Sequence, residues 1–535
     1  MKTLLKILIT ISILFTNYFS FSQVEPFTKY YNLDPEWVGN YFEQIIHTPD
    51  GGYAAVFNQN QGFTMRTSLL KLDQYGEVEW QTIIEDEAYL NINGFSLCID
   101  NFGNYYIAGS VQVIFNDEFA QYDALLSKFD NDGNILWTKN YNLNPDNTGT
   151  SETIHKIVAT ENNKVIAVGC QSYCEETPYE NSLVLCFDSN GEIDWMWYDC
   201  DDNVFQEGFV LRTNLVSVIG TPEGAFYAVG STNVAKWFNG SLWKHSYLGL
   251  IVKFNEDGEI IYNKSIGLPD FQTNFTDICM ISDNDFAVTG WISDTSLVNL
   301  SLEDQQALFI FDSTFNLKYQ NNKFIGGGSS KQRITMTKDS ILHVVAATDI
   351  LKIDSESDYK NDLLILKYST KGELLWYKYI GGHDIDIFTG PLCVIDNPDN
   401  SVTYGYNQHD YTSKSGFSSV LMKIDSLGNG IYDESDFPYP DSSEYIIYNE
   451  SANEEISDLT IYPNPASDEI IINIPENKTI NCELEFYSIT GKIVLKMPLS
   501  EPQNRINISH FRNGIYILSI KVSGKYIYKK IVVNH

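Results

Sequence analysis

The sequence predicts an all-β protein, and three observations support this fold class. Tyrosine (34 residues) and phenylalanine (30 residues) are abundant, and aromatic residues favour β-strands. Clusters of glycine, asparagine and aspartate recur along the chain, and these residues favour tight turns. One turn-and-strand phrase also occurs seven times at nearly constant spacing. We therefore expect strands and turns rather than helices.

Residues 1–22 have the features of a signal peptide. Lys2 and Lys6 make the start of the segment basic, and residues 4–15 are otherwise mainly apolar. Ser20 and Ser22 place small residues before an expected cleavage at Gln23. A membrane span needs about 20 apolar residues, so this run is too short to remain as an anchor. We expect an exported protein with no transmembrane segment in the mature chain.

The net charge restricts the choice of partners. The chain has 70 acidic and 35 basic residues, which gives a formal charge of −35. Such a surface repels phosphate backbones, so we expect no nucleic-acid partner. The charge suits a soluble extracellular protein.

The repeated phrase begins with a polar, usually acidic, residue. A glycine follows three positions later, and an aromatic residue follows the glycine by four positions. The aromatic residues recur at intervals of 56 to 58 residues, except for an interval of 67 after the third copy. The fifth copy has phenylalanine instead of glycine. The copies are Asp73–Trp80, Asp130–Trp137, Asp188–Trp195, Asn255–Tyr262, Asp312–Tyr319, Ser369–Trp376 and Asp425–Tyr432.

Each phrase is predicted to be a β-hairpin. Apolar strands stand on both sides of it, the aspartate accepts backbone hydrogen bonds in the turn, and the glycine adopts a positive φ. A second hairpin precedes the phrase in most repeats, with strands such as Tyr105–Gly109 and Lys164–Gly169. Two hairpins make a four-stranded antiparallel unit.

Seven such units in tandem predict a seven-bladed β-propeller over residues 23–432. A single unit cannot bury its apolar faces alone, so the ring must close. Residues 27–32 mimic residues 137–142, an outermost strand, and we expect them to complete the seventh blade. Two stacked sheets or a shorter open array are the alternatives. Over residues 40–432 the repeats resemble propeller repeats of secreted Bacteroidetes-type proteins, which implies a fold but no particular function.

Seven of the eight cysteines fall into two groups. Cys98, Cys279 and Cys393 occupy one repeated strand position where valine or isoleucine stands elsewhere, so we expect core thiols there. Four others cluster in the third repeat, where a disulfide between Cys170 and Cys186, or one using Cys174, is plausible in an exported protein. No histidine has ligand spacing nearby, which disfavours a metal site.

After residue 432 the composition changes. Residues 433–458 contain nine acidic residues and no basic ones, and we interpret them as a linker. Residues 459–535 contain short strands with alternating apolar residues, separated by turns, and predict a small Ig-like β-sandwich.

This tail resembles the type A C-terminal sorting domain of the type IX secretion system. The resemblance implies passage through the outer membrane by that secretion machinery, and a secreted or outer cell-surface location. In this family the domain is usually cleaved off, and the cargo is released or attached to surface lipopolysaccharide. The matching residues are Tyr462, Pro463, Asn464, Pro465, Asp468, Gly491, Lys492, Gly514, Tyr516, Lys529 and Lys530.

Chemical motifs are scarce. The eight histidines are dispersed, and no HExxH, GxSxG or phosphate-binding loop occurs. We therefore assign no catalytic residue, metal ligand or cofactor. The fourth repeat is about ten residues longer than the others, and Trp237 and Trp243 lie in its extra segment. Exposed tryptophans on a loop could bind a sugar or a partner, and packing against the adjacent blade is the alternative.

Three functions remain open. The first is a non-enzymatic binding, adhesion or structural protein with an extracellular protein or glycan ligand, and it is our prediction. The second is a hydrolase or lyase acting on polysaccharide. The third is a component of surface assembly or export. A cleft at the centre of the ring with paired carboxylates or a histidine would favour the enzyme, and an empty or tyrosine-lined channel would favour binding.

Overall fold

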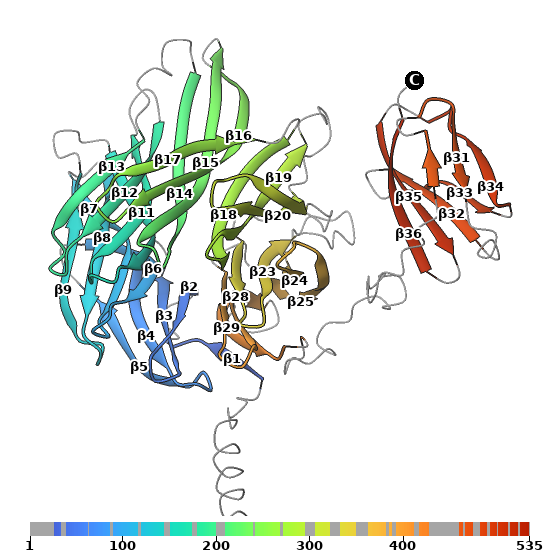
Figure 1. The fold of residues 1–535 in the computed structure, drawn as a ribbon. Helices are drawn as coiled ribbons and strands as arrows, with labels where there is room; N and C mark the ends of the chain where they lie inside the picture. Colours follow the sequence, from blue (N-terminus) through green and yellow to red (C-terminus); the bar gives the residue numbers. More distant parts are fainter. Residues whose placement is uncertain are drawn as a thin grey trace, which may run out of the picture. The chain divides into compact units, whose positions relative to one another are not determined.

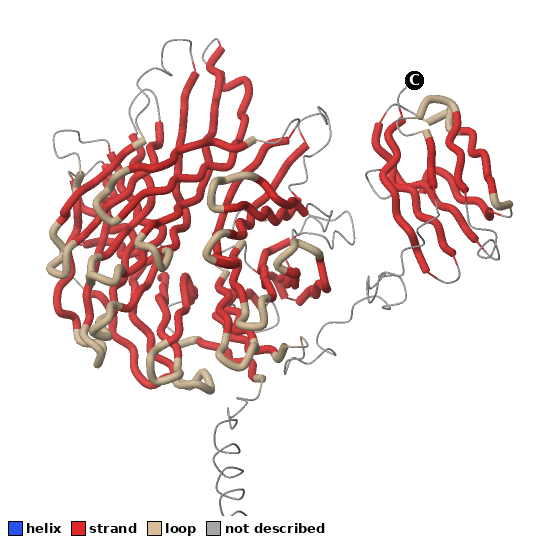
Figure 2. Tube along the Cα trace, in the orientation of Figure 1, coloured by secondary structure: helices blue, strands red, loops and turns tan. Residues whose placement is uncertain are grey.

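The computed structural model is all-β, and its described residues form strands and connecting turns (Figure 2). The chain separates into two compact units, Met1–Tyr448 and Asn449–His535, and each is treated by itself. The predicted signal peptide and acidic linker lie outside the described residues. These are residues 26–33, 39–61, 64–85, 89–115, 119–143, 150–173, 179–199, 209–238, 241–267, 271–294, 305–321, 332–348, 362–380, 385–387, 392–410, 417–426, 428, 460–463, 466–473, 482–488, 493–499, 501–511, 514–522 and 525–533.

The first unit is built from the repeats, each of which forms four consecutive antiparallel strands. The strands of the first three repeats are β2 (Gly39–His47), β3 (Tyr53–Gln61), β4 (Thr64–Leu72), β5 (Val78–Ile84), β6 (Tyr89–Ile99), β7 (Tyr105–Phe115), β8 (Phe119–Phe129), β9 (Ile135–Tyr141), β10 (Thr150–Ala159), β11 (Val165–Tyr173), β12 (Tyr179–Phe187) and β13 (Ile193–Tyr198). Those of the next three are β14 (Phe209–Gly220), β15 (Ala225–Phe238), β16 (Ser241–Asn255), β17 (Ile260–Ile266), β18 (Phe271–Ser282), β19 (Asp285–Asp294), β20 (Gln305–Asp312), β21 (Leu317–Asn321), β22 (Arg333–Met336), β23 (Ile341–Thr348), β24 (Asp362–Ser369) and β25 (Leu374–Ile380).

The last repeat takes one strand from the other end of the unit. Its strands are β26 (Ile385–Ile387), β27 (Cys393–Asp396), β28 (Val402–Asp410), β29 (Phe417–Ile424) and, from the N-terminus, β1 (Phe27–Tyr31). Strand β1 pairs antiparallel with β29, with Phe27 opposite Lys423 and Tyr31 opposite Ser419. This is the pairing that the sequence predicted.

The first strands of the repeats contact one another in cyclic order. Strand β2 contacts β6, followed by β10, β14, β18, β22 and β27, and β27 contacts β2 again. In Figure 1 the colours of the repeats follow one another around a common centre, so that the blue first repeat lies beside the orange last repeat. The result is a propeller-like arrangement of small sheets.

Apolar clusters join neighbouring repeats. Each cluster draws its buried residues from two successive repeats, because the strands of a repeat present apolar side chains on both faces here. The cluster between the last and first repeats contains Phe27, Phe42, Cys393 and Leu421. The fold therefore buries its core between the sheets.

The turn of each repeated phrase has the predicted chemistry. In the third repeat, Asp188 Oδ1 accepts hydrogen bonds from the amides of Asn190 and Glu192, both at 2.8 Å. Gly191 adopts a φ of 79°, and its amide donates to the Asp188 carbonyl at 3.0 Å. A residue with a Cβ would be strained at that φ, which explains the recurrent glycine.

The repeated aromatic residue packs on the turn of the next repeat. A Cβ added at Gly133 would lie 2.4 Å from Trp80, and one at Gly191 would lie 2.6 Å from Trp137. The fifth repeat, which lacks the glycine, stacks the ring of Phe315 on Tyr262 with centroids 3.9 Å apart. The repeated phrase thus encodes contacts between repeats as well as a turn.

Strand β1 makes the same contacts to the first repeat that β9 makes to the third. Tyr31 Oη donates to the carbonyl of Gly76 at 2.6 Å, as Tyr141 Oη donates to Gly191 at 2.7 Å. Lys29 pairs with Glu77 at 2.5 Å, as Lys139 pairs with Glu192 at 2.6 Å. The N-terminal segment is therefore equivalent to an outermost strand.

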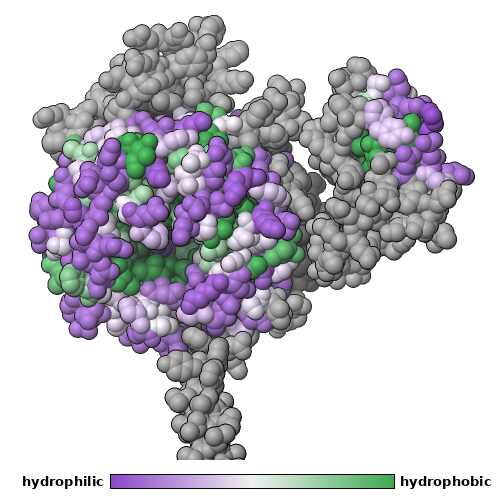
Figure 3. Space-filling view, viewed as in Figure 1, coloured by the Kyte–Doolittle hydropathy of each residue, from purple (hydrophilic) through white to green (hydrophobic). Residues whose placement is uncertain are grey.

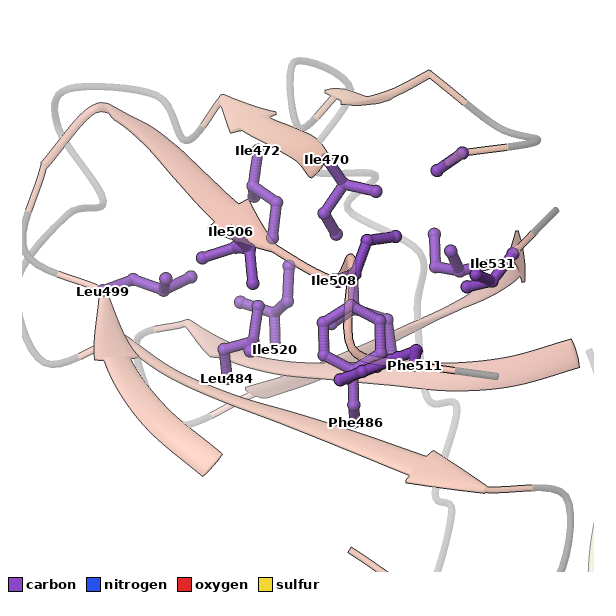
Figure 4. Close-up of a cluster of buried hydrophobic side chains, with 13 residues drawn as sticks. Ile470, Ile472, Leu484, Phe486, Leu499, Ile506, Ile508, Phe511, Ile520 and Ile531 are labelled. Carbon is purple, nitrogen blue, oxygen red and sulfur yellow. The ribbon is translucent and has the colours of Figure 1, made fainter. Parts of the chain in front are cut away.

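The second unit consists of two small antiparallel sheets. One has the order β30-β31-β34 and the other the order β33-β32-β35-β36. Figure 4 shows that Ile470, Ile506, Phe486 and Ile520 from these strands share one apolar core. The strands are β30 (Thr460–Tyr462), β31 (Glu469–Asn473), β32 (Cys482–Ser488), β33 (Ile493–Leu499), β34 (Gln503–Asn507), β35 (Gly514–Val522) and β36 (Lys525–Val533).

Candidate functional site

The segment from Tyr462 to Asp468, at the start of the tail, lies at the edge of the tail's core. Tyr462 ends β30 and is 44% exposed. The Asp468 carbonyl accepts a hydrogen bond from the amide of Ile508 at 2.8 Å, which ties the start of β31 to the segment after β34. Its carboxylate accepts from Ser467 Oγ at 3.3 Å. Asn464 and Pro465 lie outside the described residues.

The other predicted tail residues fall in or beside the larger sheet. Gly514 begins β35 opposite Val533, and Tyr516 packs on Phe511 with ring centroids 4.8 Å apart. Lys529 and Lys530 lie in β36, and nothing is described of their side chains. Gly491 and Lys492 are outside the described residues.

The predicted binding loop of the fourth repeat is a strand pair instead. Trp237 lies in β15 opposite Leu242, and Trp243 lies in β16. The extra residues lengthen a hairpin because they continue the backbone ladder, in which Lys236 pairs with Lys244. The tryptophan side chains themselves are outside the described set.

The predicted disulfide between Cys170 and Cys186 is wrong. Cys170 and Cys186 are both free and buried. Cys170 lies opposite Ser182, and Cys186 lies opposite Ile166, so the two are offset by four residues along the strands. This offset is roughly 13 Å at about 3.3 Å per residue, too far for a bond that needs Cα atoms about 4.4–6.8 Å apart. Cys174 and Cys200 lie outside the described residues.

Cys98, Cys279 and Cys393 are core residues as predicted, but they do not share one strand position. Cys98 and Cys279 are equivalent, whereas Cys393 lies at the position of Ser96 and Asp277, two residues earlier in its strand. Cys98 and Cys393 are buried in apolar clusters between repeats, and Cys279 packs at the edge of another. Burial raises the pKa of the Cys393 thiol to about 12. These cysteines are core residues.

Equivalent residues of the seven first strands meet at the inner edge of the repeats. Each lies opposite the same position of the second strand of its repeat. In the first five repeats this residue directly follows a β-bulge, and in the last two it is the first residue of its strand. We call them the inner ring. Its members are Gln44, Ser96, Lys156, Ser217, Asp277, Arg333 and Cys393.

Several inner-ring side chains bond to the next strand. Gln44 Oε1 accepts from the amide of Leu97 at 3.0 Å, and Ser96 Oγ accepts from the amide of Ile157 at 3.0 Å. The pattern joins neighbouring repeats because a side-chain oxygen satisfies a backbone amide across each boundary.

Asp277 continues the pattern. Its Oδ2 accepts from the amide of Ile334 at 3.0 Å, and its Oδ1 accepts from Ser217 Oγ at 2.6 Å. In the last repeat the amide of Ile45 donates to Cys393. Polar groups of the inner ring are therefore largely engaged in holding the repeats together.

Lys156 and Arg333 depart from this pattern. Both are partly exposed at the inner edge, and neither forms an ion pair within 4.0 Å with any described residue. Burial lowers the pKa of Lys156, Asp277 opposes this effect, and Arg333 adds to it. The two cations thus come close enough to affect one another, although they belong to different repeats.

His155 precedes Lys156 at a β-bulge. Its Nδ1 contacts the carbonyl of Leu215 at 3.0 Å, and its ring meets Phe95 edge-on with centroids 6.2 Å apart. Burial lowers the pKa of His155. The inner edge thus combines cations, a carboxylate and a histidine. The histidine is one of the two features expected of an enzyme, but its Nδ1 contacts a backbone carbonyl, and among the inner-ring residues Asp277 is a single carboxylate rather than a pair.

A buried carboxyl lies away from the inner ring. Glu152 in β10 is fully buried, and its Oε1 accepts from Gln171 Nε2 at 2.8 Å. Among the described residues, its Oε2 has no hydrogen-bond partner. Burial raises its pKa to about 7, and Asp123 adds to this effect. No sequence motif marks this environment, because it depends on how the strands pack around the carboxyl.

Two findings concern metals and membranes. Within the described ranges, no group of three or more His, Cys, Asp or Glu side chains could hold a metal ion. The same part of the chain contains no helix with the length and apolarity of a membrane span.

In Figure 3 the visible surface of the repeats is largely hydrophilic, with hydrophobic residues in small separate groups.

The fold and the tail define a class, that of exported all-β repeat proteins with a separate C-terminal β-module. Residues 460–534 match the family described as Secretion system C-terminal sorting domain. The tail is therefore a type IX secretion sorting domain, and the protein is directed to the cell surface or the extracellular space.

Curated proteins gave no significant match to this chain. Among solved structures, a protein of unknown function from Dyadobacter fermentans shares 10% identity over 75% of this chain and 98% of its own, with a TM-score of 0.43. The NanB sialidase of Streptococcus pneumoniae shares 10% identity over 77% and 72%, with a TM-score of 0.40. A Penicillium chrysogenum alpha-L-arabinanase shares 11% identity over 76% and 98%, with a TM-score of 0.37. No functional argument rests on similarities of this size.

Proposed function

We propose that the protein is a seven-bladed β-propeller that binds an extracellular protein or glycan without catalysing a reaction, and that its tail is an Ig-like sandwich. The cyclic order of the first strands, from β2 to β27 and back to β2, carries the architecture. An open array or two stacked sheets would leave the first and last repeats without contact. The pairing of β1 with β29 supports the same closure.

The engagement of polar groups supports binding rather than catalysis. A group that transfers protons must reach the substrate with a free atom. At the inner ring, both oxygens of Asp277 accept hydrogen bonds within the scaffold, and His155 Nδ1 contacts a backbone carbonyl. These groups serve the structure, whereas the rigid ring offers a platform on which a ligand can bind.

The alternative is a hydrolase or lyase that acts on polysaccharide. The raised pKa of Glu152, at about 7, favours it, because a general acid works best with a pKa near the ambient pH. Full burial argues against it, since a substrate cannot reach this carboxyl.

A paired screen tests the proposal. The secreted full-length protein is applied to an array of glycans and surface proteins, and the same preparation is assayed on a panel of polysaccharides. We expect saturable binding to at least one ligand and no product above a heat-inactivated sample. Release of reducing ends or unsaturated sugars that Glu152→Gln abolishes would replace this proposal with the enzyme.

A further inference from the structure

The inner ring contains two cations that its structural pattern does not require. Three ring residues with an acceptor atom, Gln44, Ser96 and Asp277, satisfy an amide of the next repeat's first strand. Lysine and arginine side chains have only donors, so Lys156 and Arg333 cannot do this. A serine or valine at either position would avoid the cost of desolvating a charge.

The charges are also incompletely neutralised. Asp277 is the ring's carboxylate, and its two oxygens are occupied by Ser217 and by the amide of Ile334. Arg333 Nη1 donates to the adjacent carbonyl of Gln332 at 3.1 Å, and no described carboxylate lies within 4.0 Å of either cation. Two cations that repel one another at a partly buried position favour the arrival of an anion.

From this arrangement we propose that Lys156 and Arg333 bind the anionic group of a ligand at the inner edge of the repeats, and that the ligand is an acidic sugar bound through its carboxylate. The planar guanidinium suits a carboxylate, because it can donate two parallel hydrogen bonds. The Phe95 ring near His155, one residue before Lys156, offers an apolar surface of the kind on which sugars pack. This inference rests on the proposed binding function and specifies its ligand class.

Calorimetric titration of the full-length protein tests the inference, with sodium glucuronate, glucose and sodium sulfate as probes at constant ionic strength. The variants are Lys156→Gln and Arg333→Gln, and the control is Lys338→Gln, which makes the same charge change at an exposed turn. We expect glucuronate to bind and glucose not to bind. Each ring variant should weaken glucuronate binding about tenfold or more, because a charge-assisted hydrogen bond is lost, while the control should not.

Titration with sulfate tests whether the site prefers a sugar carboxylate or accepts any anion. Weaker binding of sulfate than of glucuronate supports a sugar carboxylate, and equal or tighter binding overturns the sugar assignment. Arg333→Lys keeps the charge and should retain part of the affinity, and melting curves check that every variant is folded.

Absence of glucuronate binding, or equal binding by the ring variants and the wild type, overturns the inference. If the array then shows a neutral glycan or protein ligand, the proposed binding function stands without this site. If the array shows no ligand either, both proposals fail.

Discussion

The contact between an aromatic residue and the turn of the next repeat can be tested by Gly133→Ala. Gly133 adopts a φ of 85° in the turn of the second repeat, and Trp80 of the first repeat covers it. The new Cβ would lie 2.4, 2.5 and 2.9 Å from three carbon atoms of the Trp80 ring. Real Cβ atoms do not approach other atoms so closely, so the ring or the turn must move.

The expected loss has two components. Alanine in a left-handed conformation costs about 1–2 kcal/mol, and overpacking of a filled site costs about 1–3 kcal/mol. We therefore expect Gly133→Ala to lower the free energy of unfolding by about 2–5 kcal/mol. Gly51→Ala is the matched control, because Gly51 has a φ of 89° and an added Cβ would meet nothing within 4 Å. It should lose the backbone component alone, about 1–2 kcal/mol.

Denaturant unfolding followed by tryptophan fluorescence and circular dichroism measures both variants. A double-mutant cycle isolates the contact, since Trp80→Ala removes the ring that the new methyl group would strike. In that background, the effect of Gly133→Ala should fall to that of Gly51→Ala. Equal losses for Gly133→Ala and Gly51→Ala in the otherwise wild-type chain would refute packing of Trp80 on this turn.

Three further features can be tested: the buried carboxyl of Glu152, the strand β1, and the C-terminal tail. Because the pKa of Glu152 is raised from its usual 4.5 to about 7, its contribution to stability is present below pH 4.5 and is lost as the pH rises to about 7. Over that range the free energy of unfolding of the wild type should fall by about 3 kcal/mol more than that of Glu152→Gln, and parallel curves from denaturant titrations would contradict the shift. Tyr31→Phe removes the hydrogen bond from Tyr31 Oη to the Gly76 carbonyl and should cost about 1 kcal/mol, whereas deletion of residues 24–35 should lower the melting temperature much further because the last repeat loses β1. Deletion of residues 460–535 should abolish surface delivery, measured by immunoblot of cell fractions and medium, and delivery equal to that of the full chain would show that the tail is not needed.

The sequence alone determined what depends on short stretches of chain. Turn residues act on their own backbone, so Asp188 and Gly191 could be predicted to form a tight turn from their identities and spacing. The strand character of residues 27–31 was likewise visible, because the segment copies an outermost strand of another repeat. The sorting domain could be recognised because its motifs occur in order along one continuous segment.

The tertiary structure decided what depends on register and on contacts between repeats. Spacing in the sequence allowed a bond between Cys170 and Cys186, but the pairing of β11 with β12 offsets them by four residues. By contrast, the segment around Trp237 contains Asn239-Gly240, a dipeptide that favours a two-residue hairpin turn, so the sequence already indicated the long hairpin that the backbone ladder of β15 and β16 shows.

The inner ring is the clearest example of a feature that depends on contacts between repeats. Its members are separated by 52 to 61 residues along the chain, and no local pattern marks them as neighbours. Closure of the repeats brings Lys156, Asp277 and Arg333 together, and only then do their charges and hydrogen bonds act on one another. The residues of each hairpin determine its local hydrogen bonds, whereas the environment of a charge depends on every strand that surrounds it.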